Sequence, residues 1–269
     1  MRLIILIFIL NCNLISGQNI SGIVINEKSK LPIEYVNIGI AGKNIGTVSN
    51  VNGKYNLLID SQFDNDTLLF SCIGYLPFSI KIADLKKVDH KNVFLEEKVY
   101  EINEIIIRPK IFKQKILGVT TNSKRIQAGF KDNLLGYECG ILMKVKKSAV
   151  IKSVNISVCE CSYDTIFFRL NIYKVHGKIN FENILSNPIY INLPKDKVKD
   201  KIVIDIQSQH IGVDGDFLVT LENVKDLGKG KLFFCAGLMD KTYYRKTSQG
   251  EWLTLPIGIS LSIDAEVEK

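Results

Sequence analysis

Hydrophobic and polar residues alternate with a period of two along much of the chain, and amphipathic helical periodicity is nearly absent. Neighbouring side chains of a β-strand point to opposite faces, so this alternation predicts strands with one buried face. In the first block, turn signals such as Leu31-Pro32 and Asn52-Gly53 separate the alternating runs, and Asn52-Gly53 is typical of a hairpin. About seven short strands at this spacing predict a small β-sandwich. Five of the runs lie at 23–25, 36–40, 55–59, 68–70 and 78–82.

The alternation returns in a second block, from residue 136 to residue 269. Its clearest run is 257–263, where isoleucine and leucine alternate with glycine and serine. Asp214-Gly215 and the glycines at 228 and 230 mark turns between further runs. About eight strands in this length fit a jelly-roll sandwich. The chain is therefore predicted to be all-β, with an N-terminal seven-strand sandwich at 18–108 and a C-terminal jelly roll at 136–269.

The segment 109–135 between the two blocks is predicted to be a linker. Pro109 ends the preceding strand, because proline cannot join a β-ladder. The segment is also basic, which fits either a solvated linker or a patch for an anionic surface or nucleic acid. The whole chain has 35 basic and 28 acidic residues, and this mild excess does not require nucleic acid. We therefore favour a solvated linker and expect no nucleic-acid partner.

Residues 1–17 have the three-part pattern of a secretory signal peptide. A positive start, Met1-Arg2, precedes an unbroken apolar run from Leu3 to Leu10, and Ser16-Gly17 supplies small residues for cleavage. The run is too short to span a bilayer, which takes about 20 apolar residues. We expect export to the periplasm, the outer membrane surface or the exterior. A lipid on Cys12 is the alternative, and otherwise membrane association would come only through a partner.

Five cysteines remain after cleavage of the signal peptide, and an odd number cannot pair completely within one chain. Cys159 and Cys161 lie two residues apart on a predicted strand and therefore share a face. We interpret them as small core residues rather than a metal or redox pair. A disulfide between Cys139 and one of this pair stays open, and pairing cannot be deduced from sequence. The five are Cys72, Cys139, Cys159, Cys161 and Cys235, and no cofactor or metal is predicted.

The first block carries a more specific pattern than strand alternation. Its most informative part runs from Gly46-Thr47 to Gly53-Lys54-Tyr55, in which a strand and a tight glycine turn lead to a strand with an aromatic core residue. Asn50 stands where aspartate is more usual. Leu95 and the segment 101–107 correspond to the last strand of the domain and to the segment by which the chain leaves it. Residues 19 to 108 together resemble the carboxypeptidase-regulatory-like domain. This transthyretin-like sandwich of bacterial envelope proteins implies a non-catalytic module.

The second block contains, in order, the segments 168–173, 189–191, 217–221, 243–245 and 250–252. This order of strands and aromatic residues resembles jelly-roll modules of the carbohydrate-binding kind. Its densest mixture of aromatic and polar side chains is Tyr243, Tyr244, Arg245 and Trp252. Sugars stack on aromatic rings while flanking polar groups fix their orientation, so these residues are candidates for a glycan site. The alternative is that Trp252 and Tyr243 fill the sandwich core while Arg245 bridges a turn.

Other chemistry is poorly supported by the sequence. Asp214, Asp216 and Glu222 could supply oxygens to calcium, although Asp214-Gly215 is more simply a turn. Neither Gly-x-Ser-x-Gly nor His-Glu-x-x-His occurs, so no catalytic residue is predicted. We expect a non-catalytic exported envelope protein that binds a glycan or a protein partner, or acts as a scaffold. The alternative is a glycoside- or peptide-directed hydrolase with carboxylates at one end of the C-terminal sandwich.

Overall fold

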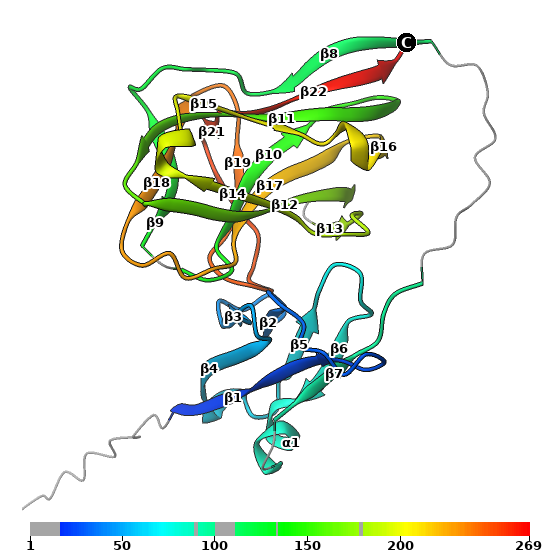
Figure 1. Cartoon of the computed structure of the whole chain (residues 1–269), viewed down its shortest axis with the longest axis vertical. Coiled ribbons are helices and arrows are strands. Elements are labelled where there is room, and N and C mark those ends of the chain that lie inside the picture. The colour runs from blue at the N-terminus through cyan, green and yellow to red at the C-terminus, as the bar shows by residue number, and fades with distance from the viewer. Residues whose placement is uncertain (1–16, 89–90, 100–110, 133, 178–179) are drawn as a thin grey trace, which may run out of the picture.

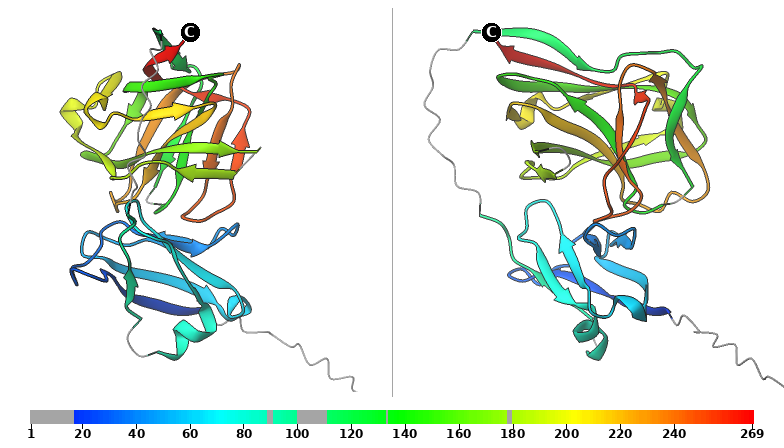
Figure 2. Two further views of the ribbon diagram at one scale, coloured as in Figure 1. Left: turned by 90° about the vertical axis from the view of Figure 1, so that its right-hand side faces the viewer. Right: turned by 180° about the vertical axis from the view of Figure 1, so that it is seen from behind.

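The computed structural model describes residues 17–88, 91–99, 111–132, 134–177 and 180–269, which form two stacked β-rich lobes (Figure 1). Views from the side and from behind show the same division (Figure 2). The predicted signal peptide up to residue 16, including Cys12, lies outside the described residues, as does the predicted exit strand at 101–107. Among the described residues, no helix is both long and apolar enough to cross a membrane.

The first lobe consists of two sheets with a shared core, as the sequence predicted. One sheet has the strand order β4-β1-β7 and the other β3-β2-β5-β6. Strand β4 shows the alternation directly, because Tyr55, Leu57 and Ile59 are buried while the residues between them are exposed. The elements are β1 (Gly17–Asn26), β2 (Asn37–Ile40), β3 (Gly46–Val48), β4 (Lys54–Asp60), η1 (Ser61–Phe63), β5 (Thr67–Ser71), β6 (Phe78–Lys81), α1 (Ile82–Lys87) and β7 (Val93–Leu95).

The turn at Asn52-Gly53 is present, but it does not close a hairpin. Gly53 has the positive φ of 69° that the sequence predicted. The strands on either side of it belong to different sheets, since β3 pairs with β2 and β4 pairs with β1. The Gly53 carbonyl accepts a hydrogen bond from the Val24 amide, so the turn is fastened to β1. The hairpin prediction was wrong because a turn signal does not specify the partner of each strand.

The second lobe also consists of two facing sheets. A seven-stranded sheet has the order β13-β12-β17-β10-β19-β20 with β14 beside β12, and an eight-stranded sheet contains β21-β18-β11-β22-β8 with β9, β15 and β16. This arrangement confirms an all-β sandwich, while its jelly-roll connectivity stays a prediction. Its strands are β8 (Phe112–Gly118), β9 (Gln127–Lys131), β10 (Glu138–Met143), β11 (Ser148–Cys161), β12 (Thr165–His176), β13 (Asn180–Asn183), β14 (Ile189–Pro194), β15 (Lys201–Asp205), β16 (Gly212–Asp214), β17 (Phe217–Asn223), β18 (Lys231–Gly237), β19 (Thr242–Arg245), β20 (Leu253–Leu255), β21 (Gly258–Ile259) and β22 (Leu261–Glu268). Short 3-10 turns are η2 (Lys195–Lys197) and η3 (Gln207–Gln209).

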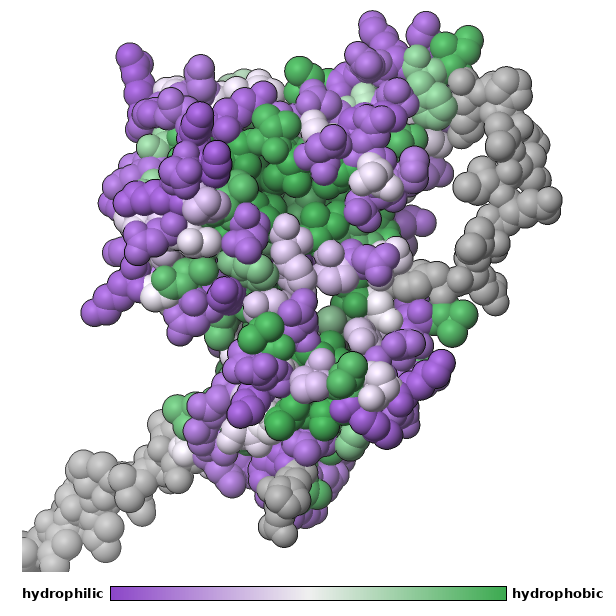
Figure 3. Space-filling model, viewed as in Figure 1, coloured by the Kyte–Doolittle hydropathy of each residue, from purple (hydrophilic) through white to green (hydrophobic). Residues whose placement is uncertain are grey.

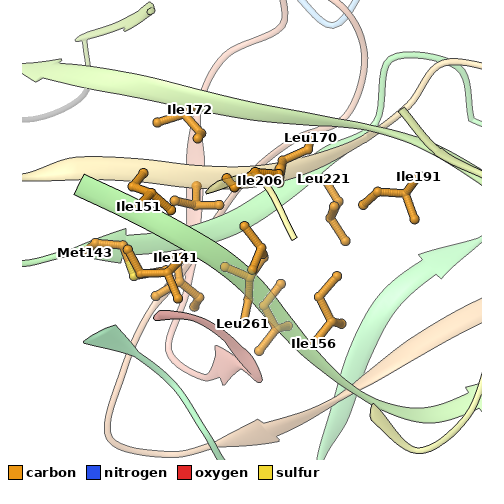
Figure 4. Packing of buried hydrophobic residues seen from close by; sticks show 14 of the residues in the cluster. Ile141, Met143, Ile151, Ile156, Leu170, Ile172, Ile191, Ile206, Leu221 and Leu261 are labelled. Carbon is orange, nitrogen blue, oxygen red and sulfur yellow. The ribbon is translucent and has the colours of Figure 1, made fainter. Parts of the chain in front are cut away.

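The core of the second lobe lies between its two sheets (Figure 4). Ile141, Leu170 and Leu221 reach into it from the seven-stranded sheet, and Ile156 and Leu261 meet them from the eight-stranded sheet. Alternate residues of the same strands necessarily point away from this core. The outer face of the seven-stranded sheet is turned towards the first lobe (Figure 1).

The predicted linker at 109–135 needs correction over its described residues. Strand β8 pairs with β22 along the edge of the eight-stranded sheet, and β9 pairs with β18. Both therefore belong to the second sandwich. Strand β8 resembled a linker because it is an edge strand whose residues are nearly all exposed, including Lys113 and Lys115. Lysines on edge strands are a common means of discouraging further strand pairing.

Replacing the fully buried Phe168 with alanine tests the core of the second lobe. Phe168 is 1% exposed and its ring lies 4.4 Å from that of Phe130. We expect Phe168→Ala to lower the free energy of unfolding by about 3–5 kcal/mol, because it leaves a cavity in a close-packed core. The measurement is urea denaturation followed by the fluorescence of Trp252. The control is Phe112→Ala on edge strand β8, which should change stability little; equal losses in both variants would contradict this packing.

Candidate functional site

Four charged side chains form a row across four neighbouring strands of the seven-stranded sheet. Arg169 on β12 lies opposite Glu222 on β17, Glu222 lies opposite Glu138 on β10, and Glu138 lies opposite Arg245 on β19. The next residues along these strands, among them Leu170, point into the core. The row therefore occupies the outer face of the sheet, and we call it the ionic row.

The ionic row is buried even though it lies outside the core. Glu138 and Glu222 are both 0% exposed, Arg169 is 2% exposed and Arg245 is 7% exposed. Arg169 Nη2 lies 2.7 Å from Glu222 Oε2, and Arg245 Nη2 lies 2.6 Å from Glu138 Oε2. Arg245 Nη2 also lies 3.8 Å from Glu222 Oε1. Each carboxylate thus has a guanidinium partner, which is the condition for burying charge.

Neutral side chains add hydrogen bonds to both carboxylates, while Glu222 Oε1 is buried and accepts none. Asn171 Nδ2 donates to Glu138 Oε1 at 2.9 Å and to Glu222 Oε2 at 2.8 Å. The Tyr173 hydroxyl donates to Glu138 at 2.9 Å, and Thr220 donates to the same oxygen. These donors lie on the strands that carry the row. The sheet therefore supplies most of the partners that the buried charges need.

The two carboxyl groups respond differently to this environment. Burial raises the pKa of Glu138; Arg245 counters this effect and the neighbouring Glu222 adds to it, so the pKa stays above its ordinary value. Burial also opposes ionisation of Glu222, but Arg169 and Arg245 outweigh it and hold the pKa of Glu222 below its ordinary value. Glu222 is therefore the more firmly ionised member of the pair.

The first lobe covers one end of the ionic row. Arg169 Nη1 donates to the Tyr35 carbonyl at 2.8 Å, and Nη2 donates to the side-chain oxygen of Asn37. Beside these contacts, Tyr35 and Val48 of the first lobe pack with Phe167 and Val224 of the second lobe in a small apolar cluster. The arginine thus links the two lobes as well as balancing Glu222.

Hydrogen bonds at Gln249 of the second lobe form a second contact between the lobes. The Gly42 amide donates to the Gln249 carbonyl at 2.9 Å, and Gln249 Nε2 donates to Ser71 Oγ at 2.7 Å. A Cβ atom at Gly39 would lie only 2.4 Å from the Ser248 carbonyl oxygen, so glycine is needed for the close approach. Gln249 itself has a positive φ of 61°, which non-glycine residues seldom adopt.

A cleft of about 300 Å³ opens where the two lobes meet. Polar side chains from both lobes line it, together with the aromatic residues Tyr75 of the first lobe and Tyr173 and Phe181 of the second. We call it the seam cleft. Its polar and aromatic lining includes Asn37, Ser71, Arg169, Asn171, Tyr173, Phe181, Asn183, Arg245 and Gln249. Hydrogen-bonding groups and aromatic surfaces therefore converge in one cleft between domains, where ligand sites are often found.

Three of the four ligand residues predicted from the sequence lie together beside this cleft. The Trp252 ring makes edge contacts with Tyr173 and Phe181, at 5.9 and 5.1 Å between centroids, and Phe181 contacts Tyr243 at 5.8 Å. Arg245 lies over the Trp252 ring at 5.1 Å. Phe181, Tyr243 and Trp252 are only partly buried. They form an aromatic strip on the outer face of the sheet.

Tyr244 does not belong to this group. It packs against the core of the second lobe and lies near Tyr137 on that side of the sheet. The alternative interpretation, with Trp252 and Tyr243 in the core and Arg245 bridging a turn, is also corrected. Both aromatic residues lie on the outer face, and Arg245 is paired with Glu138 across two strands. Period-two alternation explains why adjacent tyrosines separate in this way.

Sequence reasoning missed Glu138 and Arg169 and misplaced Glu222. A charged residue in a strand is normally assigned to a solvated face, and the first lobe that covers this face is not visible in the local pattern. The available signal was the position of Arg169 and Glu222 inside strongly apolar runs. Because Glu222 binds Arg169, it cannot join Asp214 and Asp216 around calcium. Within the described residues, no group of three or more His, Cys, Asp or Glu side chains could hold a metal ion.

A second hollow, of about 370 Å³, opens at the side of the second lobe. Leu185, Ile211 and Phe217 contribute to its floor, and Lys174 and Asp214 to its polar surroundings. Hydrophobic residues gather on this face of the second lobe (Figure 3). The hollow lacks the buried charges and the aromatic strip that distinguish the seam cleft, so we place the candidate site at the seam cleft.

Comparison with known proteins identifies the first lobe. Residues 20–107 match the sequence-family model described as CarboxypepD_reg-like domain. This match confirms the resemblance predicted from the sequence, and the first lobe is a domain of that family. Domains of this family are regulatory, non-catalytic modules. The resemblance of the second lobe to jelly-roll carbohydrate-binding modules is not confirmed.

No curated protein matches the chain. Among solved structures, the VP2 subviral particle of infectious bursal disease virus is 8% identical with a TM-score of 0.18, and the match covers 87% of this chain and 61% of that one. The Gx strain of the same virus gives 10% identity and a TM-score of 0.19, with 87% and 62% covered. The chain thus spans about three fifths of the length of these viral proteins. Likeness at this level supports no statement about fold or function.

Removing Arg169 tests the ionic row. Arg169→Met leaves the fully buried Glu222 without its closest partner, and we expect a loss of about 3–5 kcal/mol in the free energy of unfolding. The double variant Arg169→Met/Glu222→Gln removes the uncompensated charge and should recover much of that loss. Urea denaturation measures the free energy of unfolding of the single and the double variant. In the control Lys124→Met, the partner Asp200 is 85% exposed, so the change should stay below about 1 kcal/mol.

Proposed function

We propose that this protein is an exported, non-catalytic binding module of the cell envelope that holds a glycan in the seam cleft. The observation that carries the proposal is the convergence of amide side chains, balanced charges and a partly exposed aromatic strip at the junction of the lobes. The family of the first lobe supports a binding or scaffold role. The glycan, the envelope location and the export belong to the proposal.

The chemistry of the seam cleft suits a polar, uncharged ligand. Asn37, Asn183 and Gln249 offer amide groups, which donate and accept hydrogen bonds as sugar hydroxyls do. The two arginines are balanced by Glu138 and Glu222, so they add donors without a strong net charge. The volume of about 300 Å³ lies at the lower end of ligand pockets, which supports a terminal sugar rather than a long chain segment.

The competing hydrolase proposal would use Glu138 or Glu222, because these are the carboxylates that converge. Both have no exposed surface, and neither lines the seam cleft. A general acid or base must come within hydrogen-bonding reach of its substrate. Glu182 does line the cleft, but its Oε2 lies 3.0 Å from His176 Nε2 on the exposed side. These positions support a binding role over a catalytic one.

Glycan binding is tested by replacing Phe181, which belongs to both the seam cleft and the aromatic strip. A printed array of neutral oligosaccharides identifies a ligand, and Trp252 fluorescence then measures its dissociation constant. Phe181→Ala should weaken binding about tenfold, because a stacked aromatic surface contributes about 1 kcal/mol or slightly more. The control is Phe94→Ala in β7, where the side chain is 46% exposed in the first lobe. No binding on the array, or equal binding by both variants, contradicts the proposal.

Export is tested by expressing the full chain in a Gram-negative host and sequencing the N-terminus of the periplasmic product. We expect the mature chain to begin at Gln18, because the small residues Ser16-Gly17 precede it. Ile7→Arg interrupts the apolar run and should leave uncleaved protein in the cytoplasm. Cys12→Ser should be processed like the parent protein. Loss of processing in Cys12→Ser would instead support lipid attachment.

A further inference from the structure

Two side-chain amides at the seam cleft each keep one polar atom free. Asn37 Oδ1 accepts a hydrogen bond from Arg169, but within the described part of the chain Asn37 Nδ2 has no hydrogen-bond partner. Gln249 Nε2 donates to Ser71, and Gln249 Oε1 likewise has no partner among the described residues. Both free atoms remain open to solvent, unlike the enclosed hydroxyl of Tyr190. The cleft therefore offers one free donor and one free acceptor to a ligand.

The strand register brings these two amides together. Asn37 on β2 lies directly opposite Ser71 on β5. Side chains at directly opposite positions share a face of the sheet, with Cβ atoms about 5 Å apart. Ser71 Oγ lies 2.7 Å from Gln249 Nε2, so Gln249 reaches the same place from the second lobe. The free donor and the free acceptor thus come from different lobes, and both lie beside the Ser71 hydroxyl.

An apolar surface adjoins the two amides. Cys72 and Ile73 directly follow Ser71 in the chain, and both line the seam cleft together with Leu185 of the second lobe. Ile73 packs against the core of the second lobe, so both lobes hold this part of the cleft in place. Cys72 is a free thiol, as are Cys139 and the other cysteines, and a free cysteine behaves as a small apolar residue. The cleft thus combines a donor, an acceptor and an apolar surface next to one another.

A secondary amide that carries a methyl group has the complementary set of groups. Its carbonyl accepts from Asn37 Nδ2, its N–H donates to Gln249 Oε1, and its methyl packs against Ile73. It needs no charge, because Arg169 and Arg245 are already balanced within the ionic row. We propose that the seam cleft selects an N-acetylated sugar, whose acetamido group occupies this position. The inference rests on the proposed glycan binding and narrows it to one class of sugar.

The experiment uses the purified full chain and an array on which each neutral oligosaccharide is printed in two forms. The terminal sugar carries an acetamido group at C2 in one form and a hydroxyl group in the other. Isothermal titration calorimetry then gives both dissociation constants for the pair that binds most tightly. We expect the acetamido form to bind about tenfold more tightly, since it adds a buried methyl group and a second hydrogen bond. In saturation-transfer NMR, its acetamido methyl should receive the strongest transfer from the protein.

The variant Asn37→Asp tests the free donor and preserves the contact with Arg169. The aspartate keeps an oxygen for Arg169, but it replaces the free Nδ2 with a second oxygen. We expect about tenfold weaker binding of the acetamido form, because two oxygen acceptors then face each other. Binding of the hydroxyl form should change less than about threefold, since a hydroxyl donates to the new oxygen. The control Asn187→Asp changes an exposed asparagine outside the seam cleft and should leave both constants unchanged.

Two results would overturn the inference and leave glycan binding intact. One is equal or tighter binding of the hydroxyl form in every pair that binds. The other is a preference for the acetamido form that persists in Asn37→Asp when circular dichroism shows the native fold. An array without any bound sugar contradicts the proposed function itself, and the inference fails with it.

Discussion

Two glutamates side by side on adjacent strands impose the main constraint on this structure. Glu138 and Glu222 face each other on β10 and β17 with no contact to solvent. Such a pair can remain ionised only if positive charge reaches it from both sides, and Arg169 and Arg245 occupy the next strand on each side. The order of these four strands therefore places the two glutamates between two arginines.

The ionic row explains why the two sandwiches form one unit. The outer face of an antiparallel sheet is usually polar and wet, and here the first lobe covers part of it. Arg169 donates two hydrogen bonds to Glu222, and it also donates to the Tyr35 carbonyl and to Asn37 of the first lobe. Removing the first lobe would leave those donors and the apolar cluster around Phe167 uncovered. The first lobe does not cover Phe181 and Trp252. The seam cleft lies where this cover ends.

The sequence predicted much of the fold and part of the site. The strand alternation that identified Tyr55, Leu57 and Ile59 was sufficient because each strand contributes its own buried face. The linker prediction failed at β8, because an exposed edge strand has the composition of a loop. The aromatic candidates Tyr243 and Trp252 were found from local density alone. Arg169 and Glu138 were missed, since their burial depends on residues more than a hundred positions away.

Local sequence determined which segments form strands, where turns such as the one at Gly53 occur, and that the first lobe is a carboxypeptidase-regulatory-like sandwich. These properties depend on short-range periodicity and on residues that tolerate a positive φ. Only the tertiary structure decided which charges lie side by side and where a cleft remains. Strand order and lobe docking set these contacts. A charged side chain acquires its partner through space, and one-dimensional alternation carries no information about that distance.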